Sequence, residues 1–193
     1  MGNALISRPL IHEWSEHIGD HPGMHHTSIQ RLLKSQRRLS RFVEENQESL
    51  KQGTAGVCVY MVGVIARMFE LAGGSLRTAT WDDVRAAEAK VRPFIDGLLP
   101  LDDGFVDRFH AIDSRAQAHI LDEAVMALFV RSKREGEPDV DKVEAFKVLL
   151  TCWIVTEVLD ANWRPPADFV GESAYTYFHI EAPAASEGAD SAT

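Results

Sequence analysis

The chain has 193 residues, of which 45% are hydrophobic, 25% are charged and 8% are aromatic. That composition suits a globular domain with a hydrophobic core, and it excludes a disordered, collagen-like or disulfide-stapled chain. Twenty Lys and Arg stand against 29 Asp and Glu, and the resulting net charge of −9 argues against wholesale binding of nucleic acid.

Residues 1–26 are rich in histidine, because five of the eight histidines of the chain fall among them. They lack the charged start, apolar stretch and cleavage pattern of a signal peptide. Glycine and proline between residues 19 and 23 disfavour one continuous helix through this segment. We therefore expect a polar arm over residues 1–26 that lies on the surface of a helical domain spanning residues 27–164.

The first two predicted helices of the domain differ in how their apolar residues are distributed. From an N-cap near residue 27 to about residue 52, apolar residues recur at helical spacing, which predicts an amphipathic helix. Residues 55–72 are apolar on almost every side, and Gly73-Gly74 ends this second helix. We expect it at the centre of a bundle, since its uninterrupted apolar run is shorter than the roughly 20 residues that a membrane span requires.

The second half of the domain repeats this arrangement. Its predicted helices are a helix from Thr80 to Pro93, a short turn over residues 105–112, a helix from Ser114 to about residue 134, and an apolar helix from Asp141 to Asn162. The first and third begin with the pattern of a capping box, in which Thr80 pairs with Asp83 and Ser114 with Gln117. In each half, an amphipathic helix thus precedes an almost wholly apolar one.

This pattern predicts an all-α fold. We expect a bundle of about five to six helices, built as two related helical hairpins about a pseudo-twofold axis. Residues 42–45 resemble residues 120–123, and residues 67–70 resemble residues 157–160. Because any two amphipathic hairpins share part of this pattern, an unrelated pair of hairpins stays an alternative.

The C-terminal segment, residues 165–193, differs from the domain in composition. It holds five acids and no Lys or Arg, and so accounts for five of the nine net negative charges. Residues 175–180 are aromatic, and we expect them to dock on the bundle in an extended conformation. Residues 181–193 are mainly small or acidic, and we expect them to be disordered.

The histidine-rich arm contains a candidate site for a divalent transition metal. On a helix, His12 with Glu16 and Glu13 with His17 would be neighbours one turn apart, and imidazole with carboxylate is a common ligand set for zinc, nickel or iron. The motifs H-E-x-x-H and H-x-x-E-H each fail by one residue. The predicted ligands are His12, Glu16, His17 and His21, and the favoured alternative is a polar arm that binds no metal or other cofactor.

A second metal site inside the bundle is less favoured. His119 precedes Glu123 by one helical turn, and further acids lie at equivalent places in the two halves. Di-metal bundles use Glu-x-x-His motifs, however, and this sequence contains none. We interpret these acids as the polar edges of their helices.

A basic series lies on the first predicted helix of the domain. At about 100° per residue, Arg31, Lys34, Arg38 and Arg41 share one face, opposite the apolar face. Such a face could bind an anionic partner, namely nucleic acid, an anionic membrane or an acidic protein. Three glutamates follow within two turns, so we favour a solvated face with local ion pairs.

The two apolar helices carry more apolar residues than one bundle plainly buries. This surplus comprises Val57, Tyr60, Met61, Val64 and Met68 on the first helix, and Phe146, Leu150, Trp153 and Ile154 on the second. We favour a closed core for these residues. A homodimer face and the wall of a small-molecule cavity stay open as alternatives.

No pattern of nucleophilic catalysis or phosphate binding occurs, whether G-x-S-x-G, P-loop or G-x-G-x-x-G. Cys58 and Cys152 lie in apolar runs without Cys-x-x-Cys spacing, so we expect reduced thiols and a cytoplasmic location. We therefore interpret the protein as a non-enzymatic interaction or regulatory module that forms a homodimer and binds a protein partner. Metal binding by the arm, and binding of nucleic acid or an anionic membrane by the basic face, are the alternatives.

Overall fold

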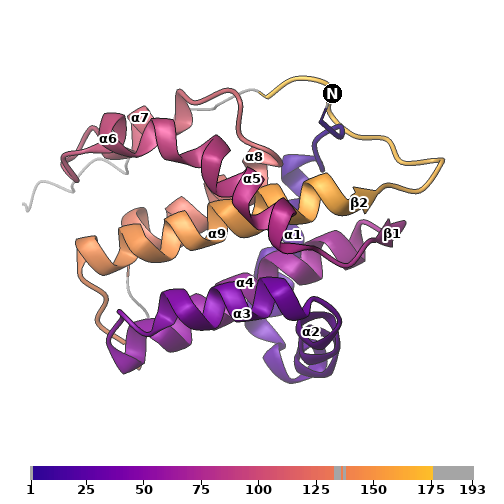
Figure 1. Ribbon diagram of the computed structural model, residues 1–193, viewed down its shortest axis with the longest axis horizontal. Helices are drawn as coiled ribbons and strands as arrows, with labels where there is room; N and C mark the ends of the chain where they lie inside the picture. The colour runs from indigo at the N-terminus through magenta and orange to yellow at the C-terminus, as the bar shows by residue number, and fades with distance from the viewer. Residues whose placement is uncertain (1, 133–135, 137, 176–193) are drawn as a thin grey trace, which may run out of the picture.

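The computed structural model describes residues 2–132, 136 and 138–175 (Figure 1). Within these residues nearly all regular structure is helical, which confirms the all-α prediction. The exception is a two-stranded antiparallel sheet of β1 (Ser75–Leu76) and β2 (Trp163–Arg164).

The described chain contains more helices than the five or six expected, because the N-terminal arm and the segment after Val91 are also helical. In chain order these are α1 (Arg8–Asp20), α2 (Pro22–Ser35), α3 (Arg37–Gln47), α4 (Gln52–Leu71), α5 (Trp81–Val91), a 3-10 turn (Arg92–Phe94), α6 (Ile95–Leu98), α7 (Phe105–His110), α8 (Ala118–Val125), a π-helical turn (Met126–Val130) and α9 (Lys142–Asn162).

The apolar helices α4 and α9 pack along each other at the centre of the molecule. In Figure 1, α9 crosses the middle, with α3 and α4 below it and α5 and α8 above it. The side chains of Phe69 on α4 and Trp153 on α9 are almost completely buried. Cys58 and Cys152 are buried free thiols, and burial raises the pKa of Cys58 to about 11. The thiol of Cys58 is therefore protonated and inert at neutral pH.

The two halves of α4 differ in how far they are buried. Most side chains of its second half are buried, whereas Val59 and Tyr60 in its first half are 39% and 47% exposed. By length and composition alone α4 could cross a membrane, and half of its most apolar stretch is buried within this fold. The exposed half of α4 forms one wall of a groove.

The prediction of a single amphipathic helix over residues 27–52 is wrong, because the helix is interrupted at Gln36, between α2 and α3. This side chain is 3% exposed and is satisfied by a distant segment. Its Nε2 donates to the carbonyl of Arg77 at 3.2 Å, and its Oε1 accepts from the backbone N–H of Ala79 at 2.8 Å. Two such bonds anchor the corner between the helices to the segment that precedes α5.

The helix expected to begin at Ser114 starts later, at Ala118. The preceding residue, Gln117, is buried and has a left-handed backbone conformation with φ 45°. Its side chain accepts from the N–H of Ile6 at 2.8 Å and donates to the carbonyl of Ala4 at 3.1 Å and to Asp160 at 2.8 Å. Gln117 therefore anchors the N-terminal residues instead of completing a capping box.

Other predicted helix ends are confirmed. Thr80 and Asp83 form the expected capping box of α5, which ends just before Pro93. Asp141 caps α9 by accepting from the N–H of Glu144. These signals involve residues within one helical turn, so they can be recognised in the sequence.

Both ends of the described chain lie against the bundle. Helix α1, within the expected surface arm, buries Ile11 and Ile18 in the main core. An antiparallel bridge between Leu5 and Glu172 ties the N-terminal residues to the C-terminal segment. Of the segment expected to dock, residues 175–180, only Tyr175 is described, and its hydroxyl donates to Asp122 on α8. Residues 176–180 and the segment expected to be disordered, residues 181–193, lie outside the described residues.

Candidate ligand-binding groove

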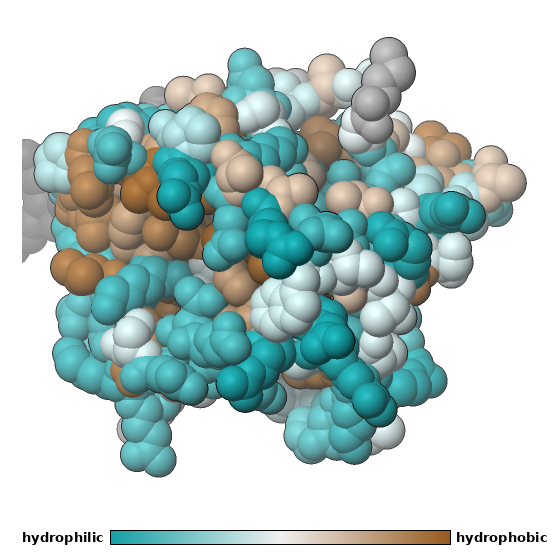
Figure 2. Space-filling model, in the orientation of Figure 1, coloured by the Kyte–Doolittle hydropathy of each residue, from teal (hydrophilic) through white to brown (hydrophobic). Residues whose placement is uncertain are grey.

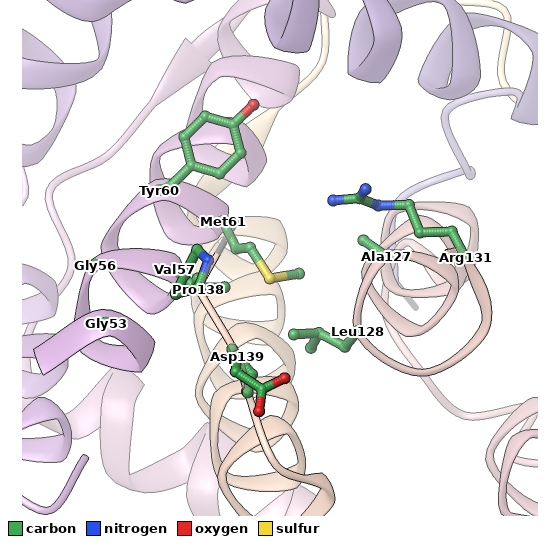
Figure 3. Close-up of a pocket in the computed structure, with 11 residues that line it drawn as sticks. Gly53, Gly56, Val57, Tyr60, Met61, Ala127, Leu128, Arg131, Pro138 and Asp139 are labelled. Carbon is green, nitrogen blue, oxygen red and sulfur yellow. The ribbon is translucent and has the colours of Figure 1, made fainter. Parts of the chain in front are cut away.

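Two adjoining cavities form a groove between α1, α4 and α8 with its π-helical turn. Their volumes are about 550 and 890 Å³, and they meet where both are lined by Tyr60, Ala127 and Arg131. Figure 3 shows these three residues on facing helices. Pockets for small organic ligands are commonly about 300–1,000 Å³, so each cavity is of sufficient size.

The smaller cavity is the apolar end of the groove. Its walls include Val57, Tyr60 and Met61 of the exposed half of α4, together with Leu128, Pro138 and Val140. In Figure 3, Met61 and Leu128 extend toward one another from opposite walls. A further small cavity is lined by Val64 and Met68 together with Tyr60 and Met61. On α4, Val57, Tyr60 and Met61 of the apolar surplus thus line the groove, whereas Val64 and Met68 belong to the buried core. On α9, Trp153 and Phe146 are buried core residues as well.

The π-helical turn from Met126 to Val130 forms the wall opposite α4. It closes with a hydrogen bond from the N–H of Arg131 to the carbonyl of Met126 at 2.9 Å. Each π turn accommodates one extra residue, which rotates the following side chains relative to those of a regular α-helix, and such turns are frequent at functional sites. None of its five residues is buried, so this part of the wall is accessible.

The larger cavity is the polar end, and two imidazole–carboxylate pairs line it. His12 on α1 reaches across to α8, where its Nδ1 lies 3.1 Å from Oε1 of Glu123. Its Nε2 lies 3.9 Å from Oε1 of Glu16 on its own helix. His119 on α8 pairs through Nε2 with Oε2 of Glu172 in the C-terminal segment, at 2.7 Å.

A buried ion pair behind His119 holds these elements in position. The guanidinium of Arg115 is fully buried and donates to Asp122 at 2.9 Å, and the hydroxyl of Tyr175 donates to the other oxygen of the same carboxylate at 2.9 Å. Burial alone would raise the pKa of Asp122, but the hydrogen bond with His110 and the charge of Arg115 outweigh it and lower that pKa. The start of α8 and the C-terminal segment are thereby joined next to the groove.

The structure divides the four predicted metal ligands between two places. His12 and Glu16 line the polar end of the groove, whereas His17 and His21 lie at the break between α1 and α2. The rings of His17 and His21 have centroids 4.7 Å apart, and the ring of His25 lies 5.2 Å from that of His17. Among the described residues no three His, Cys, Asp or Glu side chains are arranged to hold a metal, and metal binding stays a prediction.

His25 is poorly suited to bind a metal in this arrangement. Arg67 donates from Nε to Nδ1 of His25 at 3.1 Å, so the ring proton lies on Nε2 and no lone pair is left for a metal. Burial, followed by the nearby charge of Arg67, lowers the pKa of His25. The ring is therefore neutral at pH 7.

The four predicted anion-binding residues lie on two helices instead of one. Arg31 and Lys34 are on α2, and Arg38 and Arg41 are on α3, so the break at Gln36 interrupts the expected continuous face. Arg31 forms an ion pair with Glu70, and Arg41 pairs with Glu45 at 2.9 Å. Lys34 and Arg38 are exposed.

Sequence patterns pointed to only part of the groove. The spacing of His119 and Glu123 and the apolar surplus of α4 were visible in the sequence. The part played by Glu172 was not, because it depends on the bridge to Leu5 and on the hydrogen bond of Tyr175, both of which join residues far apart in the chain. Comparison with known protein families, characterised proteins and solved structures finds no match to this chain.

Proposed function

We propose that the protein is a non-enzymatic binding module whose ligand is a small amphipathic molecule held in the groove between α1, α4 and α8. The observation that carries this proposal is the junction at Tyr60, Ala127 and Arg131, where an apolar cavity adjoins a polar one. A molecule with an apolar chain and a polar head would place each part in a matching environment. The apolar walls supply binding energy and the polar groups select the head.

The proposal is tested by closing the groove at its junction. Ala127→Trp fills the space where the cavities meet without removing a polar group. We expect this variant to lose at least tenfold in affinity for the uncharged fluorescent probe Nile red, measured by fluorescence titration. Ala86→Trp, an equivalent change at an exposed position of α5, is the matched control and keeps the affinity of the parent protein.

The length of a ligand's alkyl chain provides a second test of the same proposal. Each methylene group moved from water into an apolar site contributes about 0.8 kcal/mol. Octane-1,2-diol should therefore displace Nile red at concentrations about tenfold lower than hexane-1,2-diol does. Equal potency of the two diols, or unchanged Nile red binding by the Ala127→Trp variant, would contradict a ligand site in the groove.

We also propose that the protein self-associates as a homodimer in the cytoplasm and that its two halves arose by duplication. Self-association is supported by exposed apolar side chains outside the groove, such as Leu99 and Val143, which are 48% and 60% exposed. Duplication is supported by the central pairing of α4 with α9, the apolar helices of the two expected hairpins.

Two alternative functions remain proposals. One is metal binding, which would require His12, Glu16, His17 and His21 to come together by movement at the break between α1 and α2. The other is binding of an anionic macromolecule. Its support is the exposure of Lys34 and Arg38, for which the described part of the chain provides no ion-pair partner.

A further inference from the structure

The junction of the two cavities is formed by side chains that interact well with an aromatic ring. Tyr60 of α4 is 47% exposed and lines both cavities, and so does Arg131, which follows the π-helical turn. In Figure 3, the guanidinium of Arg131 extends from its own helix across the groove, toward the side of α4 that carries Tyr60. A phenol ring pairs with other aromatic rings, and a planar guanidinium stacks on their faces. A ligand ring at the junction would therefore meet two surfaces suited to it.

Stacking leaves the other contacts of these two side chains in place. A guanidinium donates its hydrogen bonds and forms its ion pairs in the plane of the group, so its face stays available for a ring. The hydroxyl of Tyr60 lies at the edge of its ring and is directed toward α1, where a Cβ added at Gly19 would lie 3.8 Å from it. Neither residue has to give up a partner in order to bind a ring.

The apolar end adds a third side chain of this kind and borders open space. The thioether of Met61 points into the cavity opposite Leu128 (Figure 3), and sulfur makes favourable contacts with the edges of aromatic rings. Gly56 and Ala127 line the same cavity with no side chain and with a single methyl group. A Cβ added at Gly56 would meet nothing within 4 Å, so the wall of α4 leaves room next to the junction.

An alkyl chain would gain less in the same place. Both kinds of ligand gain from the burial of apolar surface, but each ring contact with Tyr60, Arg131 or Met61 strengthens binding by about two- to tenfold beyond that burial. A flexible chain also loses rotational freedom when it is bound, whereas a ring is already rigid. The lining residues thus favour an aromatic ligand over an aliphatic one.

From these observations we infer that the apolar part of the ligand is an aromatic ring, bound at the junction against Tyr60 and Arg131. This inference rests on the proposed function and names the chemical class of its ligand. The ring contacts Met61 toward the apolar end, and its polar substituent extends into the larger cavity. The ligand is thus an aromatic ring with a polar side group, and not an alkyl chain with a polar head.

The inference is tested with two uncharged alcohols that differ only in their ring. The terminal alcohols phenylbutanol and cyclohexylbutanol compete with Nile red for the full chain at pH 7. The saturated ring carries more C–H surface, so burial of apolar surface alone would favour cyclohexylbutanol. We expect the reverse, with phenylbutanol displacing Nile red at a concentration about fivefold lower. Equal or tighter binding of cyclohexylbutanol would overturn the inference and leave the groove proposal standing.

Substitutions at the junction identify the side chains responsible. Tyr60→Leu and Arg131→Leu should each reduce the preference for phenylbutanol to about twofold or less, whereas Tyr60→Phe keeps the aromatic face and the preference. Arg41→Leu removes a guanidinium from an exposed position on α3 and is the matched control. Both alcohols compete with the same probe, so the ratio of their affinities does not depend on how tightly a variant binds Nile red. A preference that survives both leucine substitutions would overturn the inference, and displacement of Nile red by neither alcohol would contradict the groove proposal as well.

Discussion

Two buried carboxylates, Asp122 and Asp160, lie in opposite electrostatic surroundings. Asp122 faces the fully buried guanidinium of Arg115, which helps to lower its pKa despite burial. Asp160 is 7% exposed, and burial raises its pKa, an effect that hydrogen bonds from Gln117 and Asn3 only partly offset. The ionised form is therefore favoured in the fold at the first position and disfavoured at the second.

Exchanging each carboxylate for its amide separates these two cases. Asp122→Asn leaves a buried guanidinium without its counter-charge, so we expect the free energy of unfolding to fall by about 3 kcal/mol at pH 7. Asp160→Asn removes a disfavoured charge and keeps an acceptor for Gln117, so we expect a change of less than about 1 kcal/mol, or a gain. Urea unfolding of both variants beside the parent protein measures the difference.

The pH dependence has a defined sign. The pKa of Asp122 is lowered in the folded state, so its contribution is present above the ordinary value of 3.8 and is lost as the pH falls through the folded-state pKa. The gap between the parent protein and Asp122→Asn should accordingly shrink below pH 3.8. Equal losses in the two variants at every pH would show that the ion pair with Arg115 contributes nothing specific.

At the scale of the elements, two of the three glycines of α4, Gly56 in its exposed half and Gly63 in its buried half, have different roles. A Cβ added at Gly63 would lie 2.7 Å from Cγ2 of Ile29 on α2, whereas one added at Gly56 would meet nothing within 4 Å. Gly63 therefore permits the close approach of α2 to α4. Gly56 has no such neighbour and only lowers the helical propensity of the exposed half.

These glycines predict opposite effects of the same substitution. Gly56→Ala should raise the free energy of unfolding by about 1 kcal/mol through helix propensity. Gly63→Ala should lower it by about 1 kcal/mol or more, because the cost of overpacking against Ile29 exceeds that gain. Thermal and urea unfolding of the two variants provides the comparison, and stabilisation by both would mean that α2 can move away from α4 at no cost.

Local signals predicted the existence of the long helices but not all of their limits. The apolar composition of α4 and α9 and the caps at Thr80 and Asp141 depend on neighbouring residues, and these predictions are confirmed. Gln36, where α2 ends, and Gln117, which precedes the start of α8, instead bond to segments at least 41 residues away. Neither amide can be distinguished in the sequence from that of an ordinary helical glutamine. The predicted helix therefore continued through Gln36, and the helix predicted from Ser114 began four residues too early.

The groove was only partly predictable for the same reason. The spacing of His12 and Glu16 on one helix predicted that they are neighbours. The number of apolar residues on α4 also indicated that this helix must pack against other elements or a ligand. Bringing α1, α8 and the C-terminal segment to one cavity requires the long-range bridge between Leu5 and Glu172. The four predicted metal ligands consequently lie in two places, with His12 and Glu16 at the groove and His17 and His21 at the break between α1 and α2.

For the whole molecule, apolar surface is unevenly distributed. Figure 2 shows a brown area at the left, over the region where Figure 1 places α6, α7 and the start of α9. Leu99 follows α6 and Val143 lies in the first turn of α9, and both are substantially exposed. Contiguous apolar surface on a soluble domain is typical of a contact site. Neither Leu99 nor Val143 lines the groove, so self-association can be tested by substitutions outside the groove lining.

If the protein self-associates through this area, a single charged side chain introduced there should abolish dimer formation. Val143→Asp replaces an exposed apolar side chain with a carboxylate, and desolvating that charge in an interface is costly. We expect the parent protein to sediment increasingly as a dimer as its concentration rises, and Val143→Asp to stay monomeric. Val170→Asp, at a position 89% exposed in the C-terminal segment, is the matched control and should dimerise like the parent. A parent protein that is monomeric at every concentration would refute the homodimer, whereas a dimer that both variants retain would place the interface elsewhere on the molecule.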